Sequence, residues 1–146
     1  MPYVEHTVTV NRPARAVFDY LADGMNNRHW RNGVLVIERT SSAEGLGATY
    51  RQVTKSGPGG TPLPEDYRVT VFDPPRRLEF LITAGPARPT GVFELTENPD
   101  QSTQVRFALD LKAAGFLKFL APMITPRLQR EVDALDNLKA ILERAS

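Results

Sequence analysis

The stretch FLKFLAPMITPRLQREVDALDNLKAILERAS (residues 116–146) decides the fold of this chain. Its apolar residues recur every three or four positions, which is the pattern of a helix with one buried face. Pro122 and Pro126 interrupt its beginning, so we expect a kink or a restart near Pro126. From there to Ala145 a helix is about 30 Å long, enough to cross a small sheet. The apolar positions are Leu117, Leu120, Ile124, Leu128, Val132, Leu135, Leu138, Leu142 and Ala145.

Strand patterns fill most of the chain before this helix. Residues 3–10 and 103–111 alternate between apolar and polar side chains, and short turns such as Asp73-Pro74-Pro75 favour antiparallel hairpins. A single helix over a curved antiparallel sheet buries both apolar faces, so the sequence predicts an α+β fold. The predicted strands are residues 3–10, 34–39, 48–55, 65–72, 78–83, 91–97 and 103–111.

Two short helical segments follow the first strand. Asn11 is a good cap and Pro13 suits a first turn, and Asp23-Gly24 ends this helix. A second helical turn spans residues 26–30. Residues 56–64 have no periodicity and predict a loop.

The composition of the chain limits the classes of protein to which it can belong. A chain of 146 residues predicts one domain over residues 1–146. With 18 Lys and Arg against 17 Asp and Glu, the net charge is +1, and we expect no nucleic-acid partner. Cysteine is absent, which excludes disulfides and thiolate chemistry. We find no signal-peptide pattern and no apolar run near the roughly 20 residues that span a bilayer, so we expect a cytoplasmic protein without a membrane segment.

The sequence holds few candidates for catalysis. His6 lies on the apolar side of the first strand, where two interpretations compete: a base or hydrogen-bond partner in a cavity, and a core or rim histidine satisfied by a neighbour. His29 is far from it in sequence and no cysteine accompanies them, so we expect no metal and no cofactor. Glu65 and Asp66 are adjacent and point to opposite faces of a strand, so one of them can face the mouth of the cavity, but we expect both to be solvated.

Aromatic side chains come from several predicted strands. Core packing explains most of them, but the space between a helix and a sheet can also hold a ligand. Tyr67 is the best single candidate, because it offers apolar area and one hydroxyl group. Arg88 can meet an anionic group at the entrance, and Met123 is an adaptable wall. The candidates for lining the cavity are His6, Trp30, Tyr50, Tyr67, Val69, Phe80, Ile82, Arg88, Phe93, Phe107, Leu120, Met123, Ile124 and Leu128.

Several segments together resemble the START-like superfamily, or SRPBCC proteins, and within it the polyketide cyclase/dehydrase and lipid-transport branch. They are NRPARAVFDYLAD (residues 11–23), RHWRNGV (28–34), YRVTVFDPPRRLEF (67–80) and the Leu-rich final helix. The resemblance implies a Bet v 1-like helix-grip fold, in which a seven-stranded antiparallel sheet wraps around the C-terminal helix and encloses a deep apolar cavity. Members of that superfamily bind lipids, sterols, plant hormones or polyketides, and a minority are enzymes.

Three hypotheses about function follow. The first is non-covalent binding of a small hydrophobic molecule, such as a lipid, an isoprenoid or a polyketide, in an internal cavity between the sheet and the C-terminal helix. The second is an enzyme of the cyclase or dehydratase type, in which Tyr67, His6 or Arg51 transfers protons or stabilises an oxyanion. The third is a protein-interaction module with a filled core. A homodimer is compatible with the sequence, although nothing in it specifies one.

Overall fold

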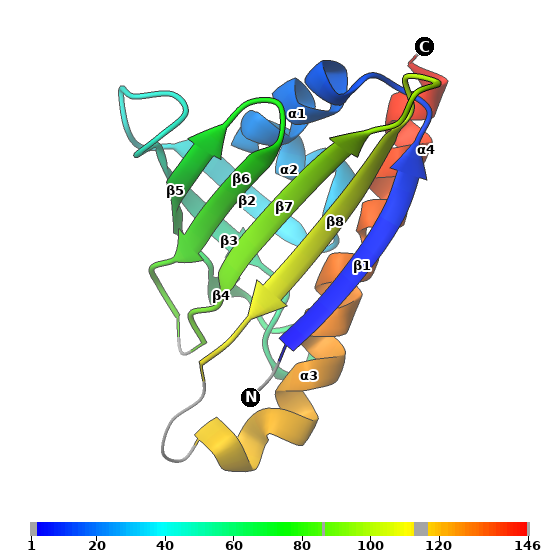
Figure 1. Cartoon of the computed structure of the whole chain (residues 1–146). Coiled ribbons are helices and arrows are strands. Elements are labelled where there is room, and N and C mark those ends of the chain that lie inside the picture. The colour runs from blue at the N-terminus through cyan, green and yellow to red at the C-terminus, as the bar shows by residue number, and fades with distance from the viewer. Residues whose placement is uncertain (1–2, 86, 113–116, 146) are drawn as a thin grey trace.

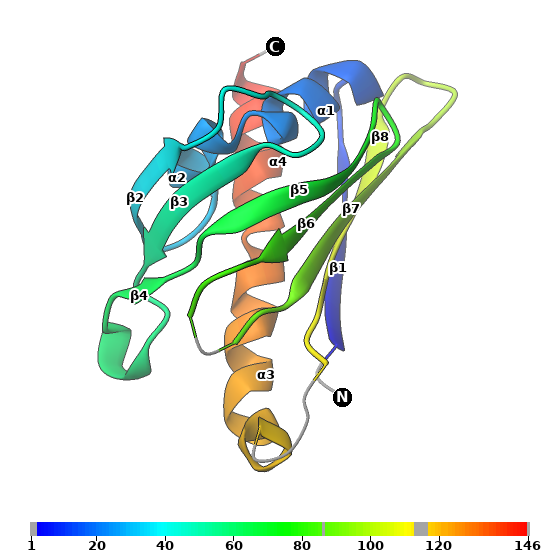
Figure 2. The same ribbon diagram turned by 90° about the vertical axis from the view of Figure 1, so that its left-hand side faces the viewer.

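Figure 1 shows the computed structural model of the chain, which describes residues 3–85, 87–112 and 117–145, with the backbone alone for residues 117–121. A curved antiparallel sheet wraps around the long C-terminal helical segment, which lies along its concave face (Figure 2). Short helices near the N-terminus cover one end of this arrangement. The fold is therefore the α+β helix-grip fold that the sequence predicts. Within the described residues, the helices are too short or too polar to cross a membrane.

The sheet runs in the order β1-β8-β7-β6-β5-β3-β2, and each neighbouring pair is antiparallel. Register shifts between Val34 and Val36 and between Val69 and Val71 mark bulges, which add local twist and bend. Residues 56–64, predicted as a loop, contain the two-residue strand β4, which pairs with β3. The strands are β1 (Tyr3–Val10), β2 (Val34–Arg39), β3 (Thr49–Thr54), β4 (Leu63–Pro64), β5 (Tyr67–Asp73), β6 (Arg77–Ile82), β7 (Thr90–Glu97) and β8 (Thr103–Asp110).

The C-terminal segment forms two consecutive helices. α3 (Leu117–Asp133) runs through both Pro122 and Pro126, and α4 (Leu135–Arg144) begins after Ala134. The expected restart near Pro126 is therefore wrong. In a helix each N–H donates to the carbonyl four residues earlier, so Pro126, which has no N–H, leaves only the carbonyl of Pro122 without its helical bond. Both prolines are exposed to water, so the helix can continue through Pro126.

The first helix begins differently from the prediction. Pro13 occupies the cap position of α1, and no side-chain cap bond is formed there. Glu97 at the end of β7 takes over this role, because its Oε1 accepts the backbone N–H of Ala14 at 2.8 Å. The predicted Asn11 cap is therefore wrong. The short helices are α1 (Ala14–Ala22), the 3-10 turns η1 (Gly24–Asn26) and η2 (Pro58–Gly60), and α2 (Asn27–Trp30).

The core lies between the helices and the concave face of the sheet. Leu135 and Leu138 are fully buried in it, and each such side chain contributes about 1.5–3 kcal/mol through burial. Trp30 packs edge-on against both Phe93 and Phe107, with ring centroids 5.9 Å apart in each case. This aromatic cluster fixes α2 over the sheet and so positions the residues described next.

Candidate functional site

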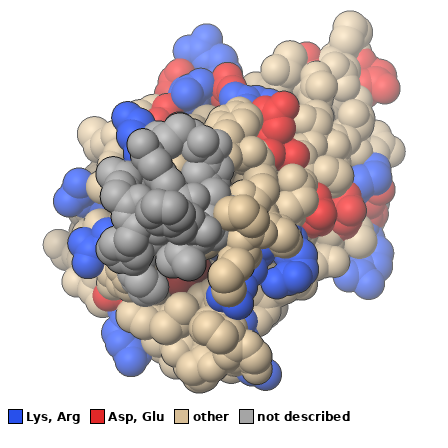
Figure 3. All heavy atoms as spheres, turned by 90° about the horizontal axis from the view of Figure 1, so that it is seen from below, with Lys and Arg blue, Asp and Glu red and all other residues tan. Residues whose placement is uncertain are grey.

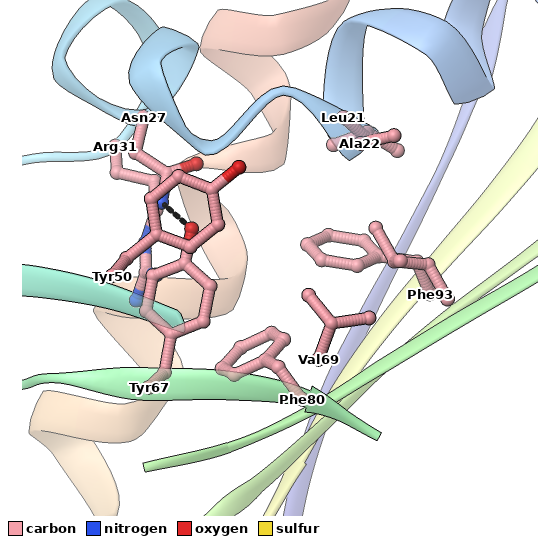
Figure 4. Close-up of a pocket in the computed structure, with 10 residues that line it drawn as sticks. Leu21, Ala22, Asn27, Arg31, Tyr50, Tyr67, Val69, Phe80 and Phe93 are labelled. Atoms are coloured by element: carbon pink, nitrogen blue, oxygen red, sulfur yellow. Dashed lines mark hydrogen bonds between the residues drawn. The ribbon is translucent and has the colours of Figure 1, made fainter. Parts of the chain in front are cut away.

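A pocket lies between the sheet and the short N-terminal helices, beside the aromatic core (Figure 4). Most of its wall is apolar, but Asn27, Arg31, Tyr50 and Tyr67 gather at one end. The free space has a volume of about 20 Å³, which is room for about one water molecule. The lining residues are Leu21, Ala22, Asn27, Arg31, Tyr50, Tyr67, Val69, Leu78, Phe80 and Phe93.

Two stacked tyrosines form part of the polar end. Tyr50 and Tyr67 face each other across β3 and β5, with ring centroids 4.9 Å apart and planes 17° from parallel. The Tyr67 hydroxyl accepts a hydrogen bond from Asn27 Nδ2 at 3.0 Å, and the Tyr50 hydroxyl accepts the N–H of Gly24 at 3.2 Å. A Cβ on Gly24 would lie 2.2 Å from the Tyr67 hydroxyl, so the close approach of η1 requires glycine. Burial raises the pKa of Tyr67 above its ordinary value, which keeps the hydroxyl protonated.

A buried ion pair lies at the same end. Arg31 Nη2 donates to Glu131 Oε2 of α3 at 2.5 Å, and the two side chains are only 5% and 18% exposed. The guanidinium carbon also lies 5.9 Å from the ring centroids of Trp30 and Phe80, within the range of a cation–π contact. The pair therefore ties α2 to α3 across the edge of the pocket.

Glu65 adds a second carboxyl group near this pair. Its Oε1 accepts a hydrogen bond from Thr54 Oγ1 at 2.9 Å. Burial raises the pKa of Glu65 and the charge of Glu131 raises it further, whereas Arg31 acts in the opposite direction. Asp66 is half-buried as well and accepts a backbone N–H of β3 at 3.3 Å. The prediction that both acidic residues are solvated is wrong, because this segment folds back onto β3.

Buried N–H groups without a partner complete the site. In the described part of the chain these are Trp30 Nε1, Arg31 Nε and Gln52 Nε2. Arg31 lines the pocket, and Gln52 accepts a hydrogen bond from Asn27, which lines it too. A buried donor left unsatisfied costs about 1–3 kcal/mol. The polar end can therefore still donate hydrogen bonds to an oxygen atom placed in the pocket.

The sequence matches the family model for polyketide cyclase/dehydrase and lipid transport over residues 1–143. The chain belongs to this family. The resemblance to the polyketide cyclase/dehydrase and lipid-transport branch is thereby confirmed. A search of curated protein sequences finds no significant match.

Solved structures share this family fold. The Zhui aromatase/cyclase from Streptomyces sp. R1128 is 23% identical, with a TM-score of 0.81 over 97% of this chain and 93% of its own. TTHA0849 from Thermus thermophilus is 20% identical, with a TM-score of 0.80 over 99% of both chains. A START superfamily protein from Mycobacterium smegmatis is 14% identical, with a TM-score of 0.79 over 99% of both chains. At these identities, the similarity shows a common fold.

Some predicted cavity residues line the pocket and others pack in the core. Tyr50 is buried while the neighbouring Arg51 is half exposed, which settles the register of β3. Ile124 is half-buried against the core. The predicted residues in the lining are Tyr50, Tyr67, Val69, Phe80 and Phe93. Those in the core are Trp30, Ile82, Phe107 and Leu128.

His6 contacts the C-terminal helices and does not line this pocket. Its Nε2 lies 2.8 Å from Asp136 Oδ1, and its Nδ1 lies 3.7 Å from Asp133 Oδ1. The imidazole therefore joins β1 to the segment where α3 ends and α4 begins. Of the two interpretations of His6, this geometry agrees with a histidine satisfied by neighbours.

The remaining predicted residues lie at or near the surface. Arg88 is exposed and donates to the carbonyl of Gly85 at 3.2 Å, and Met123 is 62% exposed. Viewed from below, the surface carries Lys and Arg side chains with Asp and Glu among them (Figure 3). The side chain of Leu120 lies outside the described residues.

The sequence interpretation missed two of the four polar residues of the pocket, Asn27 and Arg31. They are four positions apart, a spacing that places both on one side of a helical turn next to Trp30. This spacing was the available signal, but nothing local indicates that the turn is buried. The apolar residues that it missed are Leu21, Ala22 and Leu78.

The pocket is much smaller than the deep cavity that the family resemblance implies. A chain of rings fills the space, with centroids 5.3 Å apart for Tyr67 and Phe80, 6.0 Å for Phe80 and Phe93, and 4.3 Å for Phe93 and Phe107. A guest larger than water must therefore displace some of these rings.

Proposed function

We propose that this member of the polyketide cyclase/dehydrase and lipid transport family binds a small hydrophobic molecule, such as a lipid, an isoprenoid or a polyketide, between the sheet and the helices. The observation that carries the proposal is the pocket, whose apolar wall ends in a few polar groups. This combination is typical of sites that bind and orient small molecules. Tyr67 and Phe93 supply apolar area, and Asn27 and Arg31 supply polarity.

Apolar burial would provide most of the binding free energy. Each Å² of apolar surface removed from water contributes about 25 cal/mol, before the costs of ordering and ring displacement. The two tyrosine hydroxyls are each held by one hydrogen bond from the N-terminal helices, Tyr50 by Gly24 and Tyr67 by Asn27. Rotation of these rings therefore breaks few bonds, and a guest can replace their stacking contacts with its own.

Thermal melting with two ligand series tests this function. The aromatic series is 2-ethylnaphthalene, 2-acetylnaphthalene and 2-naphthoate, and the aliphatic series is decane, 2-decanone and decanoate. A ligand present at a hundred times its Kd stabilises the folded state by about 2.7 kcal/mol, or roughly 5–10 °C in a chain of this size. We expect such a shift for at least one series.

A matched pair of variants checks that the shift comes from the pocket. Ala22→Leu adds bulk to the lining, whereas Ala43→Leu adds the same bulk at an exposed position. The ligand-induced shift should shrink in the first variant and persist in the second. Absence of any shift in the wild-type protein, in both series, would contradict the proposed function.

A cyclase or dehydratase activity has weaker support. Of the three residues predicted to transfer protons or stabilise an oxyanion, only Tyr67 lines the pocket. His6 contacts Asp136, and Arg51 lies on the outside of the sheet near Glu38. The raised pKa of Tyr67 also keeps its hydroxyl protonated, so this residue is not available as a general base. Unchanged product profiles for Tyr67→Phe would reject the catalytic hypothesis.

A further inference from the structure

The unpartnered buried side-chain groups of the site share one chemical property. Trp30 Nε1, Arg31 Nε and Gln52 Nε2 are all N–H donors, and within the described residues no buried side-chain oxygen is left without a partner. Water or a guest normally satisfies such groups, because a buried unsatisfied donor is costly. The complementary group must therefore be an acceptor, since none of these three nitrogen atoms can accept a hydrogen bond in its usual protonation state.

Two of these donors belong to the polar end of the pocket. Arg31 lines it, and its Nη2 is already engaged with Glu131, which leaves Nε free on the same guanidinium. Asn27 Nδ2 donates both to Tyr67, at 3.0 Å, and to Gln52 Oε1, at 3.1 Å. The carboxamide of Gln52 therefore accepts a hydrogen bond through Oε1, while its Nε2 has no partner. The unpartnered donors close to the Asn27 end of the pocket are therefore Gln52 Nε2 from β3 and Arg31 Nε from the end of α2.

The charges of the site decide the kind of oxygen. Arg31 is the only charged residue in the described lining, and Glu131 already balances it at 2.5 Å. Glu65 is a second carboxyl group close enough for its pKa to respond to both of them. A carboxylate guest would bring another negative charge into this poorly hydrated cluster, with no further lining cation to balance it. A neutral carbonyl or hydroxyl oxygen can use the free donors without that cost.

We propose that the guest is held by a neutral oxygen acceptor, a ketone or a hydroxyl, which receives hydrogen bonds from Arg31 Nε and Gln52 Nε2. This inference rests on the proposed function and adds the ligand class. It excludes free fatty acids and other carboxylates as the preferred guests, and it places the oxygen at the Asn27 end with the apolar body toward Phe93.

Calorimetric titration with the two ligand series tests the inference. Within each series the three probes share size and shape but end in an apolar group, a ketone or a carboxylate. Because each new buried hydrogen bond has a modest net value, we expect the ketone to bind about tenfold more tightly than the hydrocarbon. The carboxylate should bind more weakly than the ketone.

Variants assign the preference to the proposed donors. Gln52→Leu removes one free donor and should reduce the preference for ketone over hydrocarbon severalfold, whereas Gln104→Leu, on the exposed side of β8, should leave it unchanged. Arg31→Met removes the other donor, but it also breaks a buried ion pair. If Arg31→Met does not fold, Gln52→Leu alone still tests the inference.

The outcomes separate this inference from the proposed function. Equal binding of ketone and hydrocarbon, tighter binding of the carboxylate, or an unaltered preference in Gln52→Leu would overturn the inference while leaving ligand binding intact. If no probe of either series binds, both the inference and the proposed function are wrong.

Discussion

Replacing Arg31 by methionine removes the cation from a buried cluster that contains two carboxyl groups. The Arg31 side chain is 5% exposed, its partner Glu131 is 18% exposed, and Glu65 lies close enough to sense both charges. Methionine keeps the unbranched stem of the side chain but lacks the guanidinium group, so the change removes the charge together with the cation–π contacts to Trp30 and Phe80. Removing one partner of a buried pair leaves an uncompensated charge, which costs about 3–5 kcal/mol.

That cost is large for a domain of this size. Typical stabilities are about 5–15 kcal/mol, and each kcal/mol corresponds to roughly 3 °C in melting temperature, so we expect Arg31→Met to melt about 10 °C lower than wild type. Urea denaturation gives the free energy of unfolding directly, and an unchanged m-value would show that the folded state stays compact. The double variant Arg31→Met/Glu131→Leu should recover part of the loss, because no unpaired charge of that pair remains buried.

Arg51→Met is the matched control. Arg51 lies 3.6 Å from Glu38, but both side chains are more than half exposed, so their interaction contributes only about 0–1 kcal/mol. The reasoning is refuted if Arg31→Met loses no more stability than Arg51→Met, or if the double variant is less stable than Arg31→Met alone.

Three further predictions concern the same region and the core. Burial raises the pKa of Glu65 above its ordinary value of 4.5, so the folded state binds the proton of this carboxyl group more tightly than the unfolded state does. The free energy of unfolding therefore falls as the pH rises from the ordinary pKa of Glu65 through its raised pKa in the folded state. Glu65→Gln should therefore flatten the pH profile in urea melts, and a profile as steep as that of wild type would contradict this. Gly24→Ala places a Cβ 2.2 Å from the Tyr67 hydroxyl, so it should lower both the melting temperature and the affinity for 2-acetylnaphthalene; retention of both would disprove the close packing. Leu138→Ala, at a fully buried position, should lower the free energy of unfolding measured in urea by about 2–5 kcal/mol. The control Leu46→Ala changes a residue that is 64% exposed and should lower it by less than about 0.5 kcal/mol; equal losses would place Leu138 outside the core.

Local periodicity was enough to predict the layers of this fold. Val105 and Phe107 alternate with polar neighbours along β8, and Leu135 and Leu138 recur at helical spacing, because each element buries one face. The same logic could not place Tyr50 and Arg51, since a slip of one residue exchanges the two faces of a strand. The pairing of β3 with β2 and β5, which buries Tyr50 opposite Tyr67 and leaves Arg51 half exposed, determines that register.

The site depends on contacts between residues that are distant in sequence. Arg31 meets Glu131, which is 100 residues away, and His6 meets Asp136, which is 130 residues away. No local pattern reports such pairs, so Arg31 was missed and the acidic partners of His6 were not foreseen. The volume of the pocket is also beyond sequence reasoning, because it depends on how rings such as Tyr67 and Phe80 stack rather than on their number.

The measurement that tests the central claim most directly is the nuclear Overhauser effect between bound 2-acetylnaphthalene and methyl groups of the isotope-labelled protein. The proposed binding site predicts contacts to Leu21, Val69 and Leu78, which line the pocket. Leu35 and Leu46 are exposed on the surface and serve as internal controls. Contacts confined to these two residues, or no contacts at all, would contradict binding between the sheet and the helices.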